Sequence, residues 1–133
     1  MTQSLSVKQF MTKKLVTFTP DMNVFDAIKI LIDNRISGGP VLDKAGDIVG
    51  ILSEVDCHKT VMDSTYNNFP SALVGDVMSK EVFTVEADMS IHSLAEKFLT
   101  HKRRRYPVVE DGKLIGQISR RDVLIAIHSM REK

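Results

Sequence analysis

A seven-residue phrase occurs twice in the chain, and this repetition restricts the fold more than any other feature. The first copy runs from Gly50 to Asp56 and the second from Gly116 to Asp122. In each copy a serine is followed three residues later by an acid, just before an apolar-periodic run, which is typical of a helix N-terminus. Free N–H groups at such an end suit an anionic or hydroxyl-rich ligand. Helix capping alone is the alternative explanation.

The duplication extends over most of the chain. Residues 7–43 align with 74–110 and, after one deleted residue, 46–56 align with 112–122. Self-similarity of this kind sets the architecture. Two copies are too few for a solenoid, so we expect two half-domains about a pseudo-twofold axis. The identical pairs are Val7/Val74, Met11/Met78, Lys13/Lys80, Thr17/Thr84, Asp21/Asp88, Met22/Met89, Pro40/Pro107, Val41/Val108, Gly46/Gly112, Gly50/Gly116, Ser53/Ser119 and Asp56/Asp122.

Each copy has the pattern strand, helix, strand, strand, helix, so the predicted fold class is α+β with two βαββα half-units. Asn23 and Ser90 are expected to N-cap amphipathic helices, and glycines 38 and 39 to end the first helix in left-handed geometry. Glycine-bearing loops should join the two hairpins. The other expected elements are strands or extended segments at 15–18 and 82–85, strands at 40–42, 48–52, 107–109 and 114–118, and closing helices after Ser53 and Ser119.

The repeats also predict the domain organisation. Residues 1–62 form the first repeat, 63–73 a polar linker and 74–133 the second repeat. The linker contains Asn67, Asn68 and Pro70, which favour irregular structure. We expect the two repeats to form one compact module.

Bulk properties exclude several classes of protein. The net charge is +1, so no overall field favours nucleic acid or a membrane. Cys57 is the only cysteine, which excludes an intrachain disulfide and is consistent with a cytoplasmic protein. No apolar run approaches the ~20 residues of a membrane span. The histidines lack ligand spacing, and Cys57 and His58, although adjacent, would point about 100° apart on a helix. We therefore predict neither a metal site nor catalysis.

The ordered set of motifs, present twice, resembles a tandem pair of CBS domains, also called a Bateman module. The set comprises Val-x-x-Φ-Met (Φ apolar), a threonine before the first helix, Pro-Val, and Gly-x-Φ-Ser-x-x-Asp, and it covers roughly Val7 to Met130. The resemblance implies two βαββα units, a homodimer, and an adenosine-containing ligand bound in clefts between the units. It implies a regulatory role, such as energy sensing, toward a protein that the sequence does not identify.

The resemblance also implies ligand-binding positions. Thr17 and Thr84 would lie at the adenine and phosphate edge, and the segments before Pro-Val would line the base. The helix starts would contact ribose and phosphate. The second copy carries arginines where the first has Glu54 or glycine, so the second cleft is the better phosphate site. The remaining positions are Ser37, Gly38, Gly39, Ser53 and Asp56 in the first copy, and Arg104, Arg105, Tyr106, Ser119, Arg120, Arg121 and Asp122 in the second.

The sequence leaves three candidate functions open. The first is a non-catalytic sensor of AMP, ADP or ATP, with S-adenosylmethionine and NAD as secondary candidates and no required cofactor. The second is a structural or protein-interaction dimer with unoccupied pockets. The third is nucleic-acid binding through Arg103–Arg105, for which one neighbouring aromatic residue, Tyr106, is a poor stacking platform. The arginine run is otherwise either an anion clamp or a solvated face.

Overall fold

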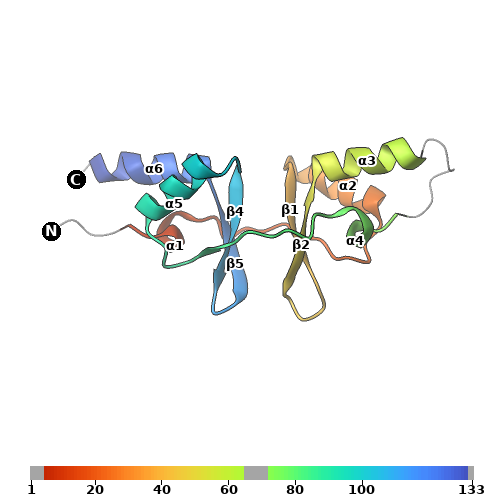
Figure 1. Cartoon of the computed structure of the whole chain (residues 1–133), viewed down its shortest axis with the longest axis horizontal. Helices are drawn as coiled ribbons and strands as arrows, with labels where there is room; N and C mark the ends of the chain where they lie inside the picture. Colours follow the sequence, from red (N-terminus) through yellow and green to blue (C-terminus); the bar gives the residue numbers. More distant parts are fainter. Residues whose placement is uncertain (1–4, 65–71, 132–133) are drawn as a thin grey trace. The chain divides into compact units, whose positions relative to one another are not determined.

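The chain folds into two compact units, each with its own sheet and helices (Figure 1). The computed structural model describes residues 5–64 and 72–131, so most of the predicted linker, residues 65–71, lies outside the described residues. Unit 1 contains the chain up to Leu15 and from Phe83 onward, and unit 2 contains Val16–Val82. The units therefore cut across the sequence repeats.

Unit 2 is built on a two-stranded antiparallel sheet. Strand β1 (Gly38–Leu42) pairs with β2 (Ile48–Ser53), and Phe18 forms an isolated parallel bridge to Val41. Figure 1 shows the helices on one side of this sheet. They are α2 (Val24–Asn34), α3 (Glu54–Ser64) and the single turn α4 (Val74–Val77).

Unit 1 repeats this plan with one more strand. Its sheet has the order β3 (Val85–Glu86), β4 (Arg105–Glu110) and β5 (Lys113–Ser119), with β3 parallel and β5 antiparallel to β4. The helices α1 (Val7–Phe10), α5 (Ile91–Thr100) and α6 (Arg120–Arg131) lie on one side of it (Figure 1). The predicted mixture of helices and strands is confirmed. Of the expected opening strands only Val85–Glu86 pairs as a strand.

The opening segment of each repeat packs on the body of the other repeat. Thr12 pairs with Gln117 of β5 through two backbone hydrogen bonds of 2.9 and 3.0 Å. Ser79 pairs with Ile51 of β2 in the equivalent way, with two bonds of 2.9 Å. The backbone N–H of Val7 also donates to Met89 O at 2.8 Å. Each unit is therefore completed by a segment from the other copy of the repeat.

Each unit has its own apolar core. Val7 from α1 is fully buried in the unit 1 core, and Val74 from α4 is fully buried in the unit 2 core. The buried positions of α2, Val24, Ala27 and Leu31, have the i, i+3, i+7 spacing of one helix face. The exchanged segments are thus part of the cores they complete. Burial of their valines stabilises each unit, because it removes apolar surface from water.

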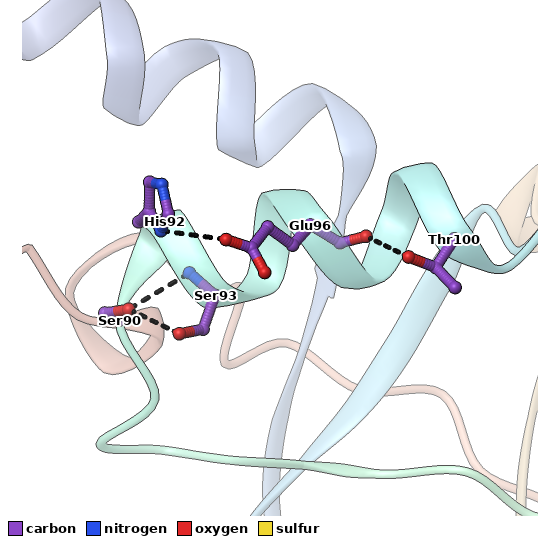
Figure 2. Close-up of polar contacts among 5 residues, drawn as sticks. All are labelled: Ser90, His92, Ser93, Glu96 and Thr100. Atoms are coloured by element: carbon purple, nitrogen blue, oxygen red, sulfur yellow. Dashed lines mark hydrogen bonds and ion pairs between the residues drawn. The ribbon is translucent and has the colours of Figure 1, made fainter.

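Both predicted N-caps of the amphipathic helices are confirmed. The side chain of Asn23 accepts a hydrogen bond from the N–H of Phe25 at 2.8 Å. The hydroxyl of Ser90 accepts one from the N–H of Ser93 at 3.0 Å, as Figure 2 shows. These bonds satisfy backbone donors that have no partner inside the helix. Further along α5, the Thr100 hydroxyl donates to Glu96 O at 2.9 Å (Figure 2).

The prediction that glycines 38 and 39 end the first helix is wrong. Helix α2 ends at Asn34, and its C-cap residue, Arg35, takes left-handed geometry with φ 54°. Both glycines lie in β1, where the backbone of neighbouring segments approaches closely. A Cβ atom on Gly38 would lie 2.5 Å from Leu52 O, and one on Gly39 would lie 2.7 Å from Val16 O. The glycines are needed for this close approach and not for a turn.

The two hairpin loops agree with their prediction. Gly46 and Gly112 have φ values of 89° and 77°, and both would accept a side chain without contact. Their role is therefore conformational, since residues other than glycine seldom adopt this backbone geometry.

Candidate functional site

The repeated phrase forms a reciprocal cap at the start of α3 and of α6. In unit 2 the N–H and the hydroxyl of Ser53 both donate to Asp56 Oδ2 at 2.9 Å, and the N–H of Asp56 donates to Ser53 Oγ at 3.3 Å. In unit 1 the N–H of Ser119 donates to Asp122 Oδ2 at 2.8 Å, and the N–H of Asp122 donates to Ser119 Oγ at 3.2 Å. The predicted helix N-termini are confirmed.

The two capping aspartates differ in their exposure. Asp56 is buried, with 8 % of its surface exposed, whereas Asp122 is half-buried. Both caps use Oδ2, which leaves Oδ1 of each carboxylate outside the cap bonds. An ionised carboxylate can accept hydrogen bonds at both oxygens at once. Capping and ligand binding are therefore compatible, and Asp122 is the more accessible of the two.

The segment before Pro-Val lies beside the capped helix start in both units. The N–H of Glu54 donates to Ser37 O at 3.0 Å in unit 2, and the N–H of Arg120 donates to Arg104 O at 3.2 Å in unit 1. These two bonds join equivalent positions of the repeat. The structure thus brings together the arginine run and the helix start of unit 1, as the site prediction required of these residues.

The charge of the two helix starts differs in sign. Arg104, Arg120 and Arg121 are exposed around the start of α6, and the positive end of the helix dipole adds to their field. The start of α3 has the exposed carboxylate of Glu54 in the same place as Arg120. An anion is therefore favoured at the unit 1 helix start and opposed at the unit 2 helix start.

In each unit the predicted threonine immediately precedes a residue that pairs with the strand containing Pro-Val. Thr84 precedes Val85, which pairs with Val108 of β4, and Thr17 precedes Phe18, which bridges to Val41 of β1. Both threonines are half-buried, so each hydroxyl lies at the edge of its core.

Tyr106, another predicted ligand residue, lies in the core of unit 1. Only 1 % of its surface is exposed, and its ring centroid is 5.0 Å from that of Phe98. Its hydroxyl has no hydrogen-bond partner among the described residues. Burial raises the pKa of Tyr106, and the charge of Arg103 opposes that shift. The equivalent residue of unit 2, Gly39, has no side chain to fill this place.

A cation–aromatic contact near this site was not predicted from the sequence. The guanidinium carbon of Arg103 lies 4.0 Å from the ring centroid of Phe83, a cation–π contact. The equivalent residues in unit 2 are Ile36 and Val16, which form an apolar pair by type. The sequence contained a signal for this contact: both apolar residues of the first copy are replaced in the second copy, one by an aromatic ring and the other by a cation.

The glycine of the repeated phrase is explained by the exchanged opening segment. A Cβ atom on Gly116 would lie 2.8 Å from Met11 Sδ and 2.7 Å from Thr12 O. A Cβ atom on Gly50 would collide with Met78 in the same way. Each methionine thus packs on the motif glycine of its own unit, and this contact links the opening segment to the strand that leads into the capped helix.

Three further features of the described residues concern metal binding, thiol chemistry and membrane crossing. No group of three or more His, Cys, Asp or Glu side chains in residues 5–64 and 72–131 could hold a metal ion. Burial, together with the negative charges of Asp56 and Glu54, raises the pKa of the Cys57 thiol, which disfavours the reactive thiolate. Among the helices described, none has the length and apolar character needed to cross a bilayer.

Comparison with known proteins identifies the fold family. Residues 7–63 and 74–129 both match the CBS domain family. The chain is 32 % identical to the uncharacterized protein MJ1426 of Methanocaldococcus jannaschii, over 91 % of this chain and 90 % of that protein. It is 34 % identical to the chloroplastic CBS domain-containing protein CBSX1 of Arabidopsis thaliana, over 91 % of this chain and 63 % of that longer protein.

A solved structure agrees with the sequence relatives. The crystal structure of CBSX2 in complex with AMP superposes with a TM-score of 0.82 at 30 % identity, covering 96 % of this chain and 98 % of that chain. The solved structure and the family match thus both show two repeats in a mixed α/β fold that spans nearly the whole sequence. The chain belongs to the CBS domain family, as a tandem pair of CBS domains.

Proposed function

We propose that this protein is a non-catalytic regulatory module that binds an adenosine-containing ligand such as AMP, ADP or ATP. The observation that carries the proposal is the start of α6. There a capped helix N-terminus, an accessible Asp122 carboxylate and the exposed Arg104 and Arg120 lie together. AMP in the related CBSX2 supports the adenosine class.

The roles follow from the chemistry of the unit 1 residues. Oδ1 of Asp122 accepts hydrogen bonds from ribose hydroxyls while Oδ2 keeps the cap. The hydroxyls of Ser119 and Thr84 and the nearby arginines bind phosphate oxygens, since arginine matches phosphate geometry well. Tyr106 supports the site from the core, and its backbone at the start of β4 lines the base.

Unit 2 would contribute differently to ligand binding. Glu54 opposes a phosphate at the α3 start, and Asp56 is buried. Thr17, Ser37, Gly38 and Gly39 can line a nucleoside that bears less negative charge. We expect the unit 2 residues to bind a phosphate-rich ligand more weakly than the unit 1 residues, or to leave that half unoccupied.

Calorimetry and thermal denaturation test this function. Purified protein is titrated with AMP, ADP, ATP, S-adenosylmethionine and NAD, and a ligand present at about 100 times its Kd should stabilise the fold by about 2.7 kcal/mol. Asp122→Asn should weaken binding by roughly 1–3 kcal/mol. Asp56→Asn is the matched control, because it changes the same kind of cap in unit 2. Absence of any stabilisation at millimolar ligand, or a larger effect of Asp56→Asn, would contradict the proposal.

The alternative functions have different outcomes in the same experiments. A structural or protein-interaction module would show no ligand stabilisation and would copurify with no nucleotide. Nucleic-acid binding through Arg103–Arg105 requires an affinity for RNA or DNA that falls steeply with salt. Arg103 is held on Phe83, which reduces its freedom to reach a phosphate backbone.

A further inference from the structure

Met11 and Met78 hold equivalent positions in the two units, at the end of each opening helix. Each is a C-cap residue: the N–H of Met11 donates to Val7 O, and the N–H of Met78 donates to Val74 O, both at 2.9 Å. Both methionines are half-buried and pack against the core of their own unit. Each therefore contacts the core while part of the residue is open to water.

In unit 1 the sulfur of Met11 lies in the space that the glycine of the repeated phrase leaves open. A Cβ atom on Gly116 would lie 2.8 Å from Met11 Sδ and 2.7 Å from Thr12 O. That carbonyl oxygen accepts the N–H of Gln117 at 3.0 Å, one of the two bonds that hold the opening segment on β5. The sulfur and the carbonyl oxygen that pairs with β5 therefore border the same small space.

Unit 2 has the same arrangement. A Cβ atom on Gly50 would meet Met78 Sδ and would lie 2.9 Å from Ser79 O. Ser79 O in turn accepts the N–H of Ile51 of β2 at 2.9 Å. A chemical change at either sulfur would therefore act directly on the backbone pairing that joins an opening segment to the body of its unit.

Oxidation of either sulfur is incompatible with this packing. A peroxide transfers one oxygen atom to the thioether, so the sulfur is oxidised, the peroxide is reduced and no C–S bond breaks. The sulfoxide is polar, and its new oxygen accepts hydrogen bonds but donates none. Beside the glycine it would face the carbonyl oxygen of Thr12 or Ser79, which is also an acceptor. The side chain must therefore leave the glycine, since burial of a polar group without a partner costs free energy.

We propose that Met11 and Met78 are oxidation sites for peroxides, and that their sulfoxides release the opening segments from β5 and β2. Hydrogen peroxide supplies the oxygen atom and leaves as water. Release exposes Val7 in unit 1 and Val74 in unit 2, both of which are fully buried in the intact fold. One reagent therefore loosens both units, because both opening segments carry the methionine. This response concerns the stability of the units and does not depend on nucleotide binding.

Other methionines of the described residues supply a comparison. Met62 and Met130 are 68 % and 48 % exposed, so a peroxide reaches them first. At the motif glycines the nearest sulfur atoms are those of Met11 and Met78. Oxidation of the two exposed methionines should therefore leave both opening segments in place.

Peptide mass spectrometry and hydrogen exchange on the same samples test the proposal. The full chain is treated with increasing hydrogen peroxide, the peroxide is removed, and sulfoxide is measured at each methionine. The N–H groups of Thr12 and Ser79 pair with β5 and β2 at 2.9 Å, so their exchange reports whether the opening segments are in place. Their exchange should rise about tenfold or more with sulfoxide at Met11 and Met78, and methionine sulfoxide reductases should reverse the rise.

Either of two results would overturn the proposal. Sulfoxide at Met11 and Met78 with unchanged exchange at Thr12 and Ser79 would show that the packing tolerates the added oxygen. Unoxidised Met11 and Met78 under conditions that fully oxidise Met62 would show that peroxide does not reach these sulfurs.

Paired substitutions assign the effect to the two sulfurs. Met11→Leu with Met78→Leu keeps the apolar volume and removes the oxidisable atoms, so peroxide should no longer change the exchange at Thr12. Met62→Leu with Met130→Leu is the matched control, which should respond to peroxide as the unsubstituted chain does. An equal response of the two double variants would show that other groups cause the release. The measurement on the unsubstituted chain decides the proposal independently of how leucine packs.

Discussion

Substitution of Gly116 by alanine tests the exchanged opening segment most directly. The added Cβ would lie 2.8 Å from Met11 Sδ, which can move, and 2.7 Å from Thr12 O, which is backbone and paired with Gln117. Overpacking of this kind costs about 1–3 kcal/mol. Displacement of Thr12 would also weaken two hydrogen bonds, each worth about 0.5–1.5 kcal/mol. We expect Gly116→Ala to lower the free energy of unfolding by about 2–3 kcal/mol.

Chemical denaturation followed by circular dichroism measures this free energy, and hydrogen exchange locates the loss. The N–H of Thr12 should exchange faster in Gly116→Ala. Gly112→Ala is a control in which the added Cβ would meet open space. Any loss of stability in that variant comes from the positive φ of 77° and not from a collision. In a Met11→Ala background the cost of Gly116→Ala should fall, because part of the collision is removed. An unchanged cost in that background would refute Met11 as the steric partner.

Three further predictions concern single side chains. Ser90→Ala should destabilise the protein by about 0.5–2 kcal/mol in thermal denaturation, because the N–H of Ser93 loses its partner; no loss would mean that the cap is dispensable. Tyr106→Phe should leave stability unchanged or raise it, because it removes a buried hydroxyl with no partner among the described residues; a loss above about 1 kcal/mol would show that the hydroxyl is bonded in solution. Burial raises the pKa of Cys57 above the ordinary value of 9.0. Above pH 9.0 the unfolded chain therefore loses the thiol proton that the folded chain keeps, and the free energy of unfolding should fall as the pH rises further. That fall should be smaller in Cys57→Ala, and equal pH profiles would contradict it.

The sequence predicted the local elements well because their signals are local. Asn23 and Ser90 are capping residues by type, and the apolar spacing after each of them matches the buried side of α2 and α5. The serine and aspartate of the repeated phrase bond to each other across three residues, so their neighbours alone specify the cap. These predictions required no knowledge of tertiary structure.

Features that depend on tertiary contact were missed. The role of Gly38 and Gly39 arises from backbone atoms of Leu52 and Val16, which the local pattern does not reveal. The exchange of opening segments could not be inferred either, because both repeats carry the same segment and either partner would fit the pattern. The stack of Arg103 on Phe83 joins residues 20 positions apart that the alignment treated separately. The ligand roles of the site residues stay predictions.

The exchange of opening segments has a consequence for the order in which the protein forms during synthesis. Unit 2 is one continuous stretch, Val16–Val82, and its parts emerge from the ribosome in succession. In unit 1, the segment that ends at Leu15 can pack only after Phe83 and the residues that follow it have been synthesised. The segment that ends at Leu15 is therefore translated before unit 2 but is among the last parts to pack, and Val7 stays exposed to water until the residues from Phe83 onward enclose it.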